Sequence, residues 1–340
     1  MRNPSRLVCF VLACVATPLS AQEGGALRLG VANTGLAIGN VHRWNGIRIN
    51  WRDRDLDRIN GLNITFWMNR DTTAVGGSVN GLSFGLAGPN AGTLNGINIG
   101  LGGAVADEAM AGINLGGLGL VSGGSIVGIN VAGLGIVADG QVSGITFGGL
   151  GVVSDGPLTG LSIAGLGVVA DGGILGVSAA GLGVVSDGGI RGISVAGLAV
   201  VADGGIEGYA SGGLAVVADG GIRGIATAGL VVVADQKLQG IAVGGLGVVS
   251  DHLQGIAAGG LLVAAGRLDG LALSVGRIVA EESHGVTIAS HNWIRGTQHG
   301  LAIGIYNSAD VLKGVQIGLL NRAKNNRPPF RWLPLVNLHL

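Results

Sequence analysis

Large apolar and small residues alternate along this chain in a pattern that returns every sixteen residues. In the unit that starts at Gly192, counted as position zero, large apolar residues occupy positions one, three, six, eight and fourteen, and position two is Ser or Ala in the neighbouring units. Alternation of this kind is typical of a β-strand. A fixed short period indicates one small structural unit copied many times, so the pattern predicts an all-β repeat protein.

Two residue types keep this step through most of the chain: a glycine at position zero, and an aspartate at position eleven that opens a turn, most often Asp-Gly-Gly. The glycines are Gly96, Gly112, Gly128, Gly144, Gly160, Gly176, Gly192, Gly208, Gly224 and Gly240. The aspartates are Asp139, Asp155, Asp171, Asp187, Asp203, Asp219, Asp235 and Asp251. After Gly240 the step between glycines shortens to fifteen residues.

The positions of the large residues predict a corner within each unit. They change from odd to even positions between three and six, which a straight strand does not permit because its side chains alternate strictly. A bend at the position-five glycine, Gly197 here, restores the alternation. One unit is therefore interpreted as one 16-residue coil of a β-solenoid, with two short strands, two corners and a third short side. The expected inward ring is Ile193, Val195, Leu198, Val200 and Ile206.

The same interpretation places the small residues of positions two, four and seven on the outside. They predict a flat, nearly uncharged face, and large faces of this kind mark interaction surfaces. The expected partner is the outer membrane, another protein surface or a second copy of the chain. Lysine at Ala164, Ala180 and Ala196 would disturb such a contact.

An alternative interpretation makes each unit one strand of an antiparallel outer-membrane β-barrel, conceivably a channel. The ten residues from Ile193 to Ala202 match the roughly 9–11 residues that such a strand needs. Two observations count against it. Odd and even units carry the same turn, whereas such barrels have short turns at one end and longer loops at the other. A water-filled lumen requires one polar face, but neither the odd nor the even positions of the segment are polar.

The N-terminal residues 1–21 are typical of a secretory signal peptide. Arg2 and Arg6 precede the apolar stretch Leu7–Ala16, and the expected cut follows Ala21. A lipoprotein signal ending at Cys14 is the alternative. Both cysteines of the chain lie in this segment, so the exported chain is expected to have no disulfide bond.

Three regions are expected after the signal. Residues 22–80 form an irregular N-terminal cap with early repeat units, and their mixed-charge run Arg52–Arg58 reads as a solvated loop. Residues 81–270 form the regular array. Residues 271–340 hold divergent repeats and a closing segment rich in proline and aromatic residues. The five tryptophans lie outside the uniform core, where they would cap the ends of a solenoid or form the interfacial belts of a barrel.

Composition argues against several function classes. Glycine supplies 69 of the 340 residues, 12% of residues are charged, and the formal net charge is zero. Nucleic-acid binding requires a clustered basic face, and none is visible. No cluster of acid, base and nucleophile interrupts the repeat, so we expect a non-enzymatic protein without a cofactor and identify no small-molecule substrate.

The aspartate column is the main candidate site. Equivalent atoms of stacked coils repeat every ~4.8 Å, so these carboxylates must lie in solvent, accept hydrogen bonds from turn amides or share cations. Turn stabilisation is the ordinary use of Asp-Gly. A cation ladder is the alternative, although the turn does not match the Gly-Gly-x-Gly-x-Asp signature of calcium-binding solenoids.

Two other motifs carry little support. Gly81–Gly85 matches Gly-x-Ser-x-Gly, but Ser83 occupies position two of an ordinary unit, and an esterase elbow needs a strand-to-helix turn. His284, His291 and His299 lie close in sequence, but their spacing fits no standard metal site.

The last units carry a resemblance. Gly300–Asn307 and Gly314–Asn321 resemble the units of a bacterial Gly-rich surface-repeat family with the pattern Gly-apolar-Gln-Ile-Gly-(Gly)-Leu-x-Asn, and Pro329–Leu335 is similar to its closing segment. The core units depart from the pattern, with Ser or Ala in place of Gln. The resemblance implies export, a cell-surface or outer-membrane location with the periplasmic face possible, and no known reaction. The expected function is a structural or interaction scaffold.

Overall fold

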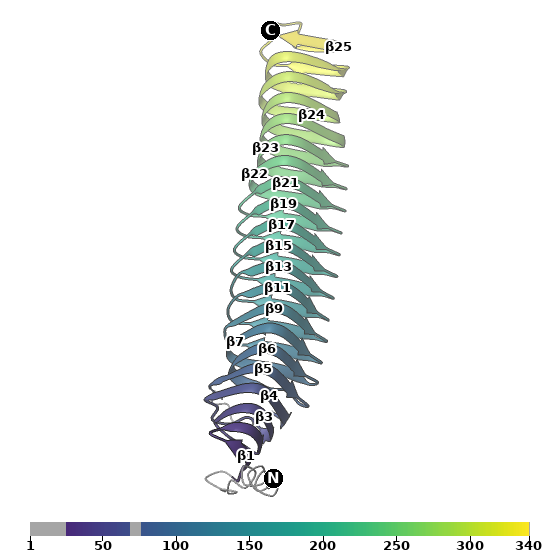
Figure 1. Cartoon of the computed structure of the whole chain (residues 1–340). Coiled ribbons are helices and arrows are strands. Elements are labelled where there is room, and N and C mark those ends of the chain that lie inside the picture. Colours follow the sequence, from purple (N-terminus) through teal and green to yellow (C-terminus); the bar gives the residue numbers. More distant parts are fainter. Residues whose placement is uncertain (1–24, 69–75, 340) are drawn as a thin grey trace, which may run out of the picture. The chain divides into compact units, whose positions relative to one another are not determined.

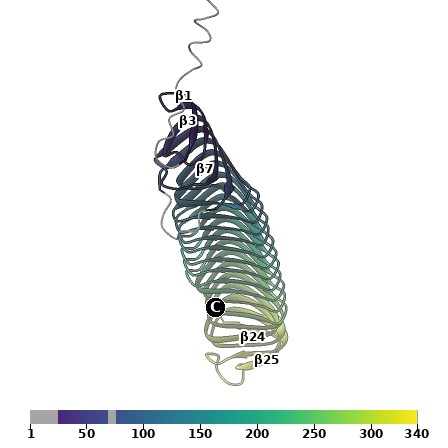
Figure 2. The same cartoon turned by 90° about the horizontal axis from the view of Figure 1, so that it is seen from below.

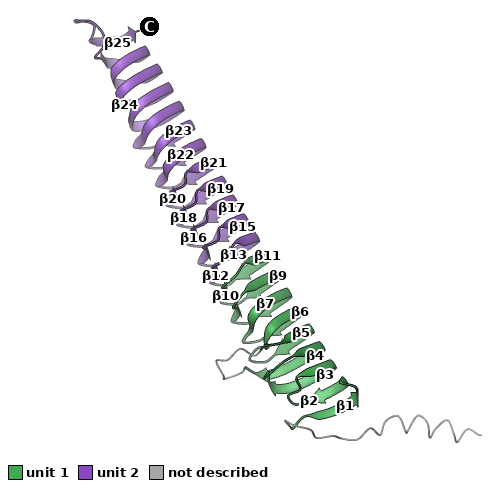
Figure 3. Ribbon diagram, turned by 90° about the vertical axis from the view of Figure 1, so that its left-hand side faces the viewer, with its two compact units in different colours: residues 1–149 green, residues 150–340 purple. Residues whose placement is uncertain are grey.

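A computed structural model of the chain describes residues 25–68 and 76–339. The predicted signal peptide and the candidate lipidation site Cys14 lie outside these residues. Two compact units are present, residues 1–149 and residues 150–340 (Figure 3). The secondary structure of the described residues consists of β-strands joined by turns and bends. These residues include no helix with the length and apolar character needed to cross a membrane.

Unit 1 is a stack of parallel coils in which strands one repeat apart pair in register. Gly96 of β6 lies opposite Gly112 of β7, and Gly112 lies opposite Gly128 of β9. β1 is the exception, because it pairs with β2 in antiparallel orientation. The strands are β1 (Leu27–Val31), β2 (Thr34–Ile38), β3 (Arg43–Arg52), β4 (Arg58–Trp67), β5 (Ser78–Gly85), β6 (Asn90–Gly100), β7 (Gly103–Gly116), β8 (Gly119–Ser122), β9 (Ser125–Ala132), β10 (Gly135–Ala138) and β11 (Val142–Gly148).

Unit 2 repeats the same coil with two parallel ladders (Figure 1). The seven-residue strands pair with one another, as Gly176 with Gly192, and the four-residue strands pair separately, as Val184 with Val200. The strands are β12 (Gly151–Ser154), β13 (Leu158–Ala164), β14 (Gly167–Ala170), β15 (Ile174–Ala180), β16 (Gly183–Ser186), β17 (Ile190–Ala196), β18 (Ala199–Ala202), β19 (Ile206–Gly212), β20 (Ala215–Ala218), β21 (Ile222–Ala228), β22 (Val231–Gly244), β23 (Gly247–Gly259), β24 (Leu262–Ala323) and β25 (Trp332–His339).

The C-terminal end of unit 2 is closed by a strand that runs against the ladder. β24 is 62 residues long and winds through successive coils, and β25 pairs with its last turn in antiparallel orientation, Gly314 opposite His339 (Figure 2). The shorter step after Gly240 is absorbed between Ala234 and Lys237, in the aspartate turn. A residue is therefore lost at the corner, and the strands on either side keep their register.

The parallel stacking confirms the β-solenoid with 16-residue coils. The antiparallel alternative required neighbouring units to run in opposite directions, and it is wrong for this reason. The predicted corner at Gly197 is also present, because β17 ends at Ala196 and β18 begins at Ala199. A Cβ at Gly197 would lie 1.9 Å from the Gly181 carbonyl oxygen of the neighbouring coil, so this position of the corner excludes any side chain.

The inward ring differs from the prediction at three of its five residues. Val200 and Ile206 are buried, but Ile193, Val195 and Leu198 are 46%, 41% and 43% exposed. The predicted third side is absent as well, because Ile206 opens β19, the first strand of the next coil. The interior of this coil is lined by Ser194, Ala196, Val200, Ala202 and Ile206.

The outward direction of Ile193, Val195 and Leu198 has a simple geometric reason. Sixteen is even, so a coil can keep strict alternation all the way round, with the even positions inside and positions six and twelve turned outward at the corners. The space between the two short strands is narrow and is filled by Ser, Ala, Val and one Ile. Protein interiors are mostly apolar, but apolar residues are also common on protein surfaces. Here the larger apolar residues at positions one and three face outward.

Polar side chains form ladders inside several coils. In unit 1, Asn98 donates to Asn114 at 2.7 Å and Asn114 donates to Asn130 at 2.8 Å, all three side chains being buried. In unit 2, Asn292 donates to Asn307 at 2.7 Å. In each of these pairs an amide N–H donates to the amide oxygen of the next coil, and such pairing lowers the cost of burying the polar groups.

A buried ion pair occupies the first coils of unit 1. The Arg48 Nη1 atom lies 2.5 Å from the Asp53 Oδ1 atom, and both side chains are at most 1% exposed. Asn63 accepts a second bond from Arg48 at 2.8 Å, and Thr65 donates to Asp53 at 2.9 Å. Burial lowers the pKa of Arg48, and the attraction of Asp53 opposes that change. Asp53 belongs to the Arg52–Arg58 run that was predicted to be solvated, and for this residue the prediction was wrong.

Candidate interaction surface

The most prominent surface feature of unit 2 is a column of exposed leucines at position six, which we call the leucine ridge. Each coil contributes one leucine at the corner between its two strands, and backbone bonds hold successive members in line, as Leu198 N–H to the Leu182 carbonyl at 2.8 Å. The exposed fractions lie between 41% and 62%. The ridge consists of Leu150, Leu166, Leu182, Leu198, Leu214, Leu230, Leu246 and Leu261.

Apolar side chains continue on both sides of the leucine ridge. On the side of the seven-residue strands, Ile193 and Val195 face outward, with Ile163, Ile225 and Val243 in other coils. On the side of the four-residue strands the outward column is valine, and the exposed members include Val153, Val185 and Val249. The surface is thus a two-sided apolar wedge, in contrast to the single flat face of small residues that the sequence predicted.

The predicted small-residue face lies inside the coil. Ala164, Ala180 and Ala196 are 4%, 9% and 4% exposed. Lysine at these positions would disturb the interior of the solenoid, so the substitutions proposed from sequence do not test a surface contact.

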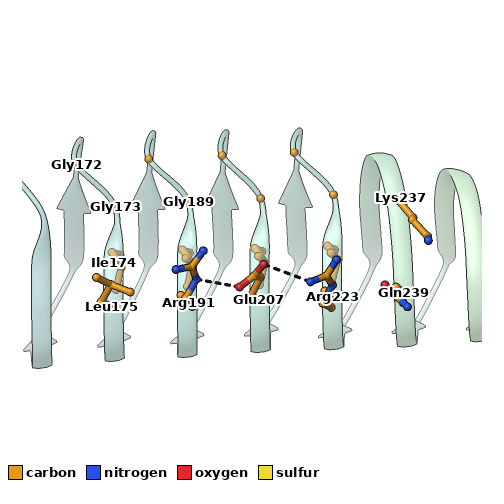
Figure 4. Close-up of a pocket in the computed structure, with 18 residues that line it drawn as sticks. Gly172, Gly173, Ile174, Leu175, Gly189, Arg191, Glu207, Arg223, Lys237 and Gln239 are labelled. Atoms are coloured by element: carbon orange, nitrogen blue, oxygen red, sulfur yellow. Dashed lines mark ion pairs between the residues drawn. The ribbon is translucent and has the colours of Figure 1, made fainter.

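Four other charged side chains of these coils lie near the glycine turns, and we call them the charged edge (Figure 4): Arg191, Glu207, Arg223 and Lys237. Glu207 lies between two arginines of the neighbouring coils, 2.9 Å from Arg191 and 3.8 Å from Arg223. These side chains and the glycine turns line a groove of about 360 Å³, together with Lys237 and Gln239. All three paired side chains are largely exposed, so solvent and salt screen the pairs, and each contributes little to stability.

Six of the aspartates follow the end of a four-residue strand and open a turn or bend, whereas Asp235 and Asp251 lie within β22 and β23. Asp139 belongs to unit 1 and the other seven aspartates to unit 2, and every one of them is exposed. The described residues contain no group of three or more His, Cys, Asp or Glu side chains that could hold a metal ion.

The remaining candidates do not converge on a catalytic arrangement. Ser83 faces the interior and is 1% exposed, which suits its position in an ordinary coil. His284 and His299 stack with their ring centroids 4.6 Å apart, and His284 Nδ1 lies 3.3 Å from Asp269. His291 belongs to another group of side chains, with its ring 5.0 Å from Tyr306.

An aromatic–arginine cluster in unit 2 was not identified from the sequence. It comprises Arg277, Trp293, Arg295, Tyr306, Arg322 and Trp332. The guanidinium carbons of Arg277 and Arg295 lie 4.3 Å and 4.6 Å from the Trp293 ring centroid, and Arg322 lies 5.0 Å from that of Trp332. Tyr306 stacks on Trp332 at 6.2 Å. The coil period of about fifteen residues, applied to residues 277–332, is the signal that could have brought these residues together.

We expect two histidines to make the stability of the chain depend on pH. Burial and the charge of Arg277 lower the pKa of His291, and burial with the charges of His284 and Lys313 lowers that of His299. Above the ordinary value of about 6.5, both histidines are neutral in the folded and the unfolded chain. Below it, the unfolded chain binds the extra protons and is favoured.

We therefore expect the urea midpoint to fall as the pH is lowered from about 7.5 to about 5.5. The variant His291→Gln with His299→Gln should show a smaller fall over the same interval. A midpoint that rises on acidification, or an equal fall in the variant, would contradict the assignment.

Comparison with known proteins adds no functional assignment. The chain matches no protein-family model, no curated protein and no solved structure.

Proposed function

We propose that this chain is an exported, non-catalytic scaffold of the bacterial cell surface or envelope, and that its function is to hold an apolar surface against a partner. The single observation that carries the proposal is the leucine ridge with its flanking columns. Soluble proteins rarely leave contiguous apolar patches larger than a few hundred Å² uncovered, and such patches mark interaction sites. The signal-like residues 1–21 and the resemblance of the last units to surface repeats support the location.

The interior of the solenoid supports a structural role. Its small side chains fill the space between the strands, and the glycines and asparagines bond from coil to coil, so the outer columns keep a fixed spacing of ~4.8 Å. A rigid surface binds with a smaller loss of conformational entropy than a mobile one. This arrangement is expected of a scaffold whose exposed side chains must stay aligned.

The test compares two triple variants in the producing cells. Leu182→Asp, Leu198→Asp and Leu214→Asp place charge on the ridge, whereas Asp187→Lys, Asp203→Lys and Asp219→Lys change the charge of the aspartate column in the same coils. We expect the leucine variant to leave the envelope fraction for the soluble fraction and the aspartate variant to remain with the envelope.

Both variants change exposed side chains, so circular dichroism and urea midpoints should stay close to those of the parent chain. This comparison separates lost contact from unfolding. Equal distribution of the parent chain and both folded variants between the fractions would overturn the proposed function.

A further inference from the structure

We propose that the leucine ridge and the aromatic–arginine cluster together bind the surface of an anionic phospholipid membrane. The ridge would enter the boundary between acyl chains and headgroups, and the arginines would bind the headgroup phosphates. This inference rests on the proposed function and identifies the partner of its apolar surface.

The shape of the apolar surface favours a fluid partner over a rigid one. Ile193 and Val195 lie on one side of Leu198, and the valine column with Val185 lies on the other. A second protein with a flat face would cover one side of the wedge and leave the other in water. Acyl chains can contact both sides, and interfacial elements bury their apolar face by about 5–10 Å.

The distribution of charge is that of an interfacial element. Between Leu150 and Val249, no charged residue stands on the ridge or on its flanking columns. The charges of these coils lie at the aspartate turns and on the charged edge, as with Arg191 and Glu207. When the ridge is bound to a membrane, the charged edge would therefore stay in water. The polar face of an interfacial amphipathic helix stays in water in the same way.

The chemistry of the aromatic–arginine cluster fits lipid headgroups. Trp and Tyr are enriched at membrane–water interfaces, and the planar guanidinium matches phosphate oxygens in a bidentate manner. Among the described residues, Arg277, Arg295 and Arg322 make no ion pair with an acidic side chain. Arg295 is exposed and Arg277 and Arg322 are half-buried, so their positive charges are accessible to an external anion.

The wider charge balance agrees with an anionic partner. Residues 271–340 carry seven basic and three acidic side chains, whereas residues 150–270 carry four basic and nine acidic ones. The positive excess therefore belongs to the part of unit 2 that contains the cluster. Anionic membrane surfaces attract such basic groups over about one Debye length.

The cluster begins beside the end of the leucine ridge. The Arg277 amide donates to the Leu261 carbonyl at 2.8 Å, as the Ala199 amide does to Leu182 at 3.1 Å, so Arg277 occupies position seven of the next coil, one residue after the ridge position. Adjacent corner residues in this region are very exposed, Val275 at 79%, Ile305 at 57% and Leu319 at 69%. From Leu150 to Leu261 the ridge spans about 34 Å, seven coil steps of ~4.8 Å. One continuous strip of unit 2 thus offers first aliphatic side chains and then aromatic and basic ones.

The test is flotation of the purified full chain with vesicles of phosphatidylcholine, with and without phosphatidylglycerol. The variant Arg277→Gln, Arg295→Gln, Arg322→Gln should lose about 100-fold in partition onto the anionic vesicles, because each basic residue at such a surface contributes about fivefold. Its binding to neutral vesicles should be unchanged. The Leu182→Asp, Leu198→Asp, Leu214→Asp variant should lose binding to both.

The matched control removes the same number of charges from the charged edge. Arg191→Gln, Arg223→Gln and Lys237→Gln should lower partition onto anionic vesicles by less than about threefold, because that edge stays in solvent beyond the contact. Equal losses in the two sets of charge variants would overturn the cluster as the headgroup site.

Two further results would reject the lipid partner. One is failure of the parent chain to float with either kind of vesicle. The other is reversible self-association of the parent chain in sedimentation velocity without lipid, abolished by the leucine variant, which would make a second copy the occupant of the ridge. Either result leaves the scaffold proposal standing, because that proposal depends on the cell fractionation alone.

Discussion

Alanine in place of Gly192 is expected to unfold the coils around it. A Cβ at this position would lie 2.1 Å from the Gly176 carbonyl oxygen in the coil below, and the φ angle is +129°, which residues with a side chain rarely adopt. The obstacle is backbone and cannot rotate away, so the coils must separate and break their ladder bonds. We expect a loss of about 4 kcal/mol or more in the free energy of unfolding, the range of severe core defects.

A matched glycine in the preceding coil provides the control. A Cβ at Gly183 would lie 3.8 Å from the Ala199 carbonyl oxygen, an ordinary contact, and the next two coils carry Ala199 and Ala215 at the same position. Gly183→Ala should therefore leave the urea midpoint close to that of the parent chain. Free energies of unfolding that agree within about 1 kcal/mol for the two alanine variants would show that the position-zero glycine is not required.

Loss of the buried carboxylate at Asp53 is the second large effect. Asp53→Ala leaves the Arg48 guanidinium, which is 0% exposed, without its counter-charge. Removing one partner of a buried pair costs about 3–5 kcal/mol, because the remaining charge is neither paired nor solvated. Chemical denaturation followed by circular dichroism would measure the change.

An exposed pair in the same unit shows what burial contributes. Arg43 Nε and Asp57 Oδ2 lie 2.9 Å apart, but the two side chains are 74% and 55% exposed. Asp57→Ala should cost at most about 1 kcal/mol. The double variant Arg48→Leu with Asp53→Leu should recover much of the lost stability, because apolar residues can replace a buried pair. Equal effects of Asp53→Ala and Asp57→Ala would contradict this account.

Most of the fold could be predicted from the sixteen-residue step of the sequence. A glycine every sixteen residues and a fixed turn predicted stacked coils, and the parallel pairing of residues such as Gly176 and Gly192 confirms them. The direction of the side chains could not be obtained in the same way. Ile193 and Ser194 are neighbours on one strand, and only the width of the interior decides which of them faces inward. That width depends on how closely the two strands of a coil approach, which residue size alone does not predict.

The candidate surface was predictable only in part. An apolar, uncharged outer surface was expected, but its composition was wrong because the inside and outside positions were exchanged. The buried Asp53 looked like one member of a solvated charge run, and its partner Arg48 lies before that run. Arg277 and Trp332 are far apart in sequence, and their shared cluster required the coil positions of the divergent C-terminal units.

The antiparallel strands β1 and β25 have a consequence for growth of the protein into fibrils. A parallel stack with a free edge presents the same row of amide and carbonyl groups that elongates an amyloid fibre, and another chain could add to it. β1 covers the edge of β2 in unit 1, and β25 covers the last turn of β24 in unit 2. Because both strands run against their ladders, neither continues the parallel order. Further chains therefore cannot extend the parallel order, and the length of the single chain determines the number of coils.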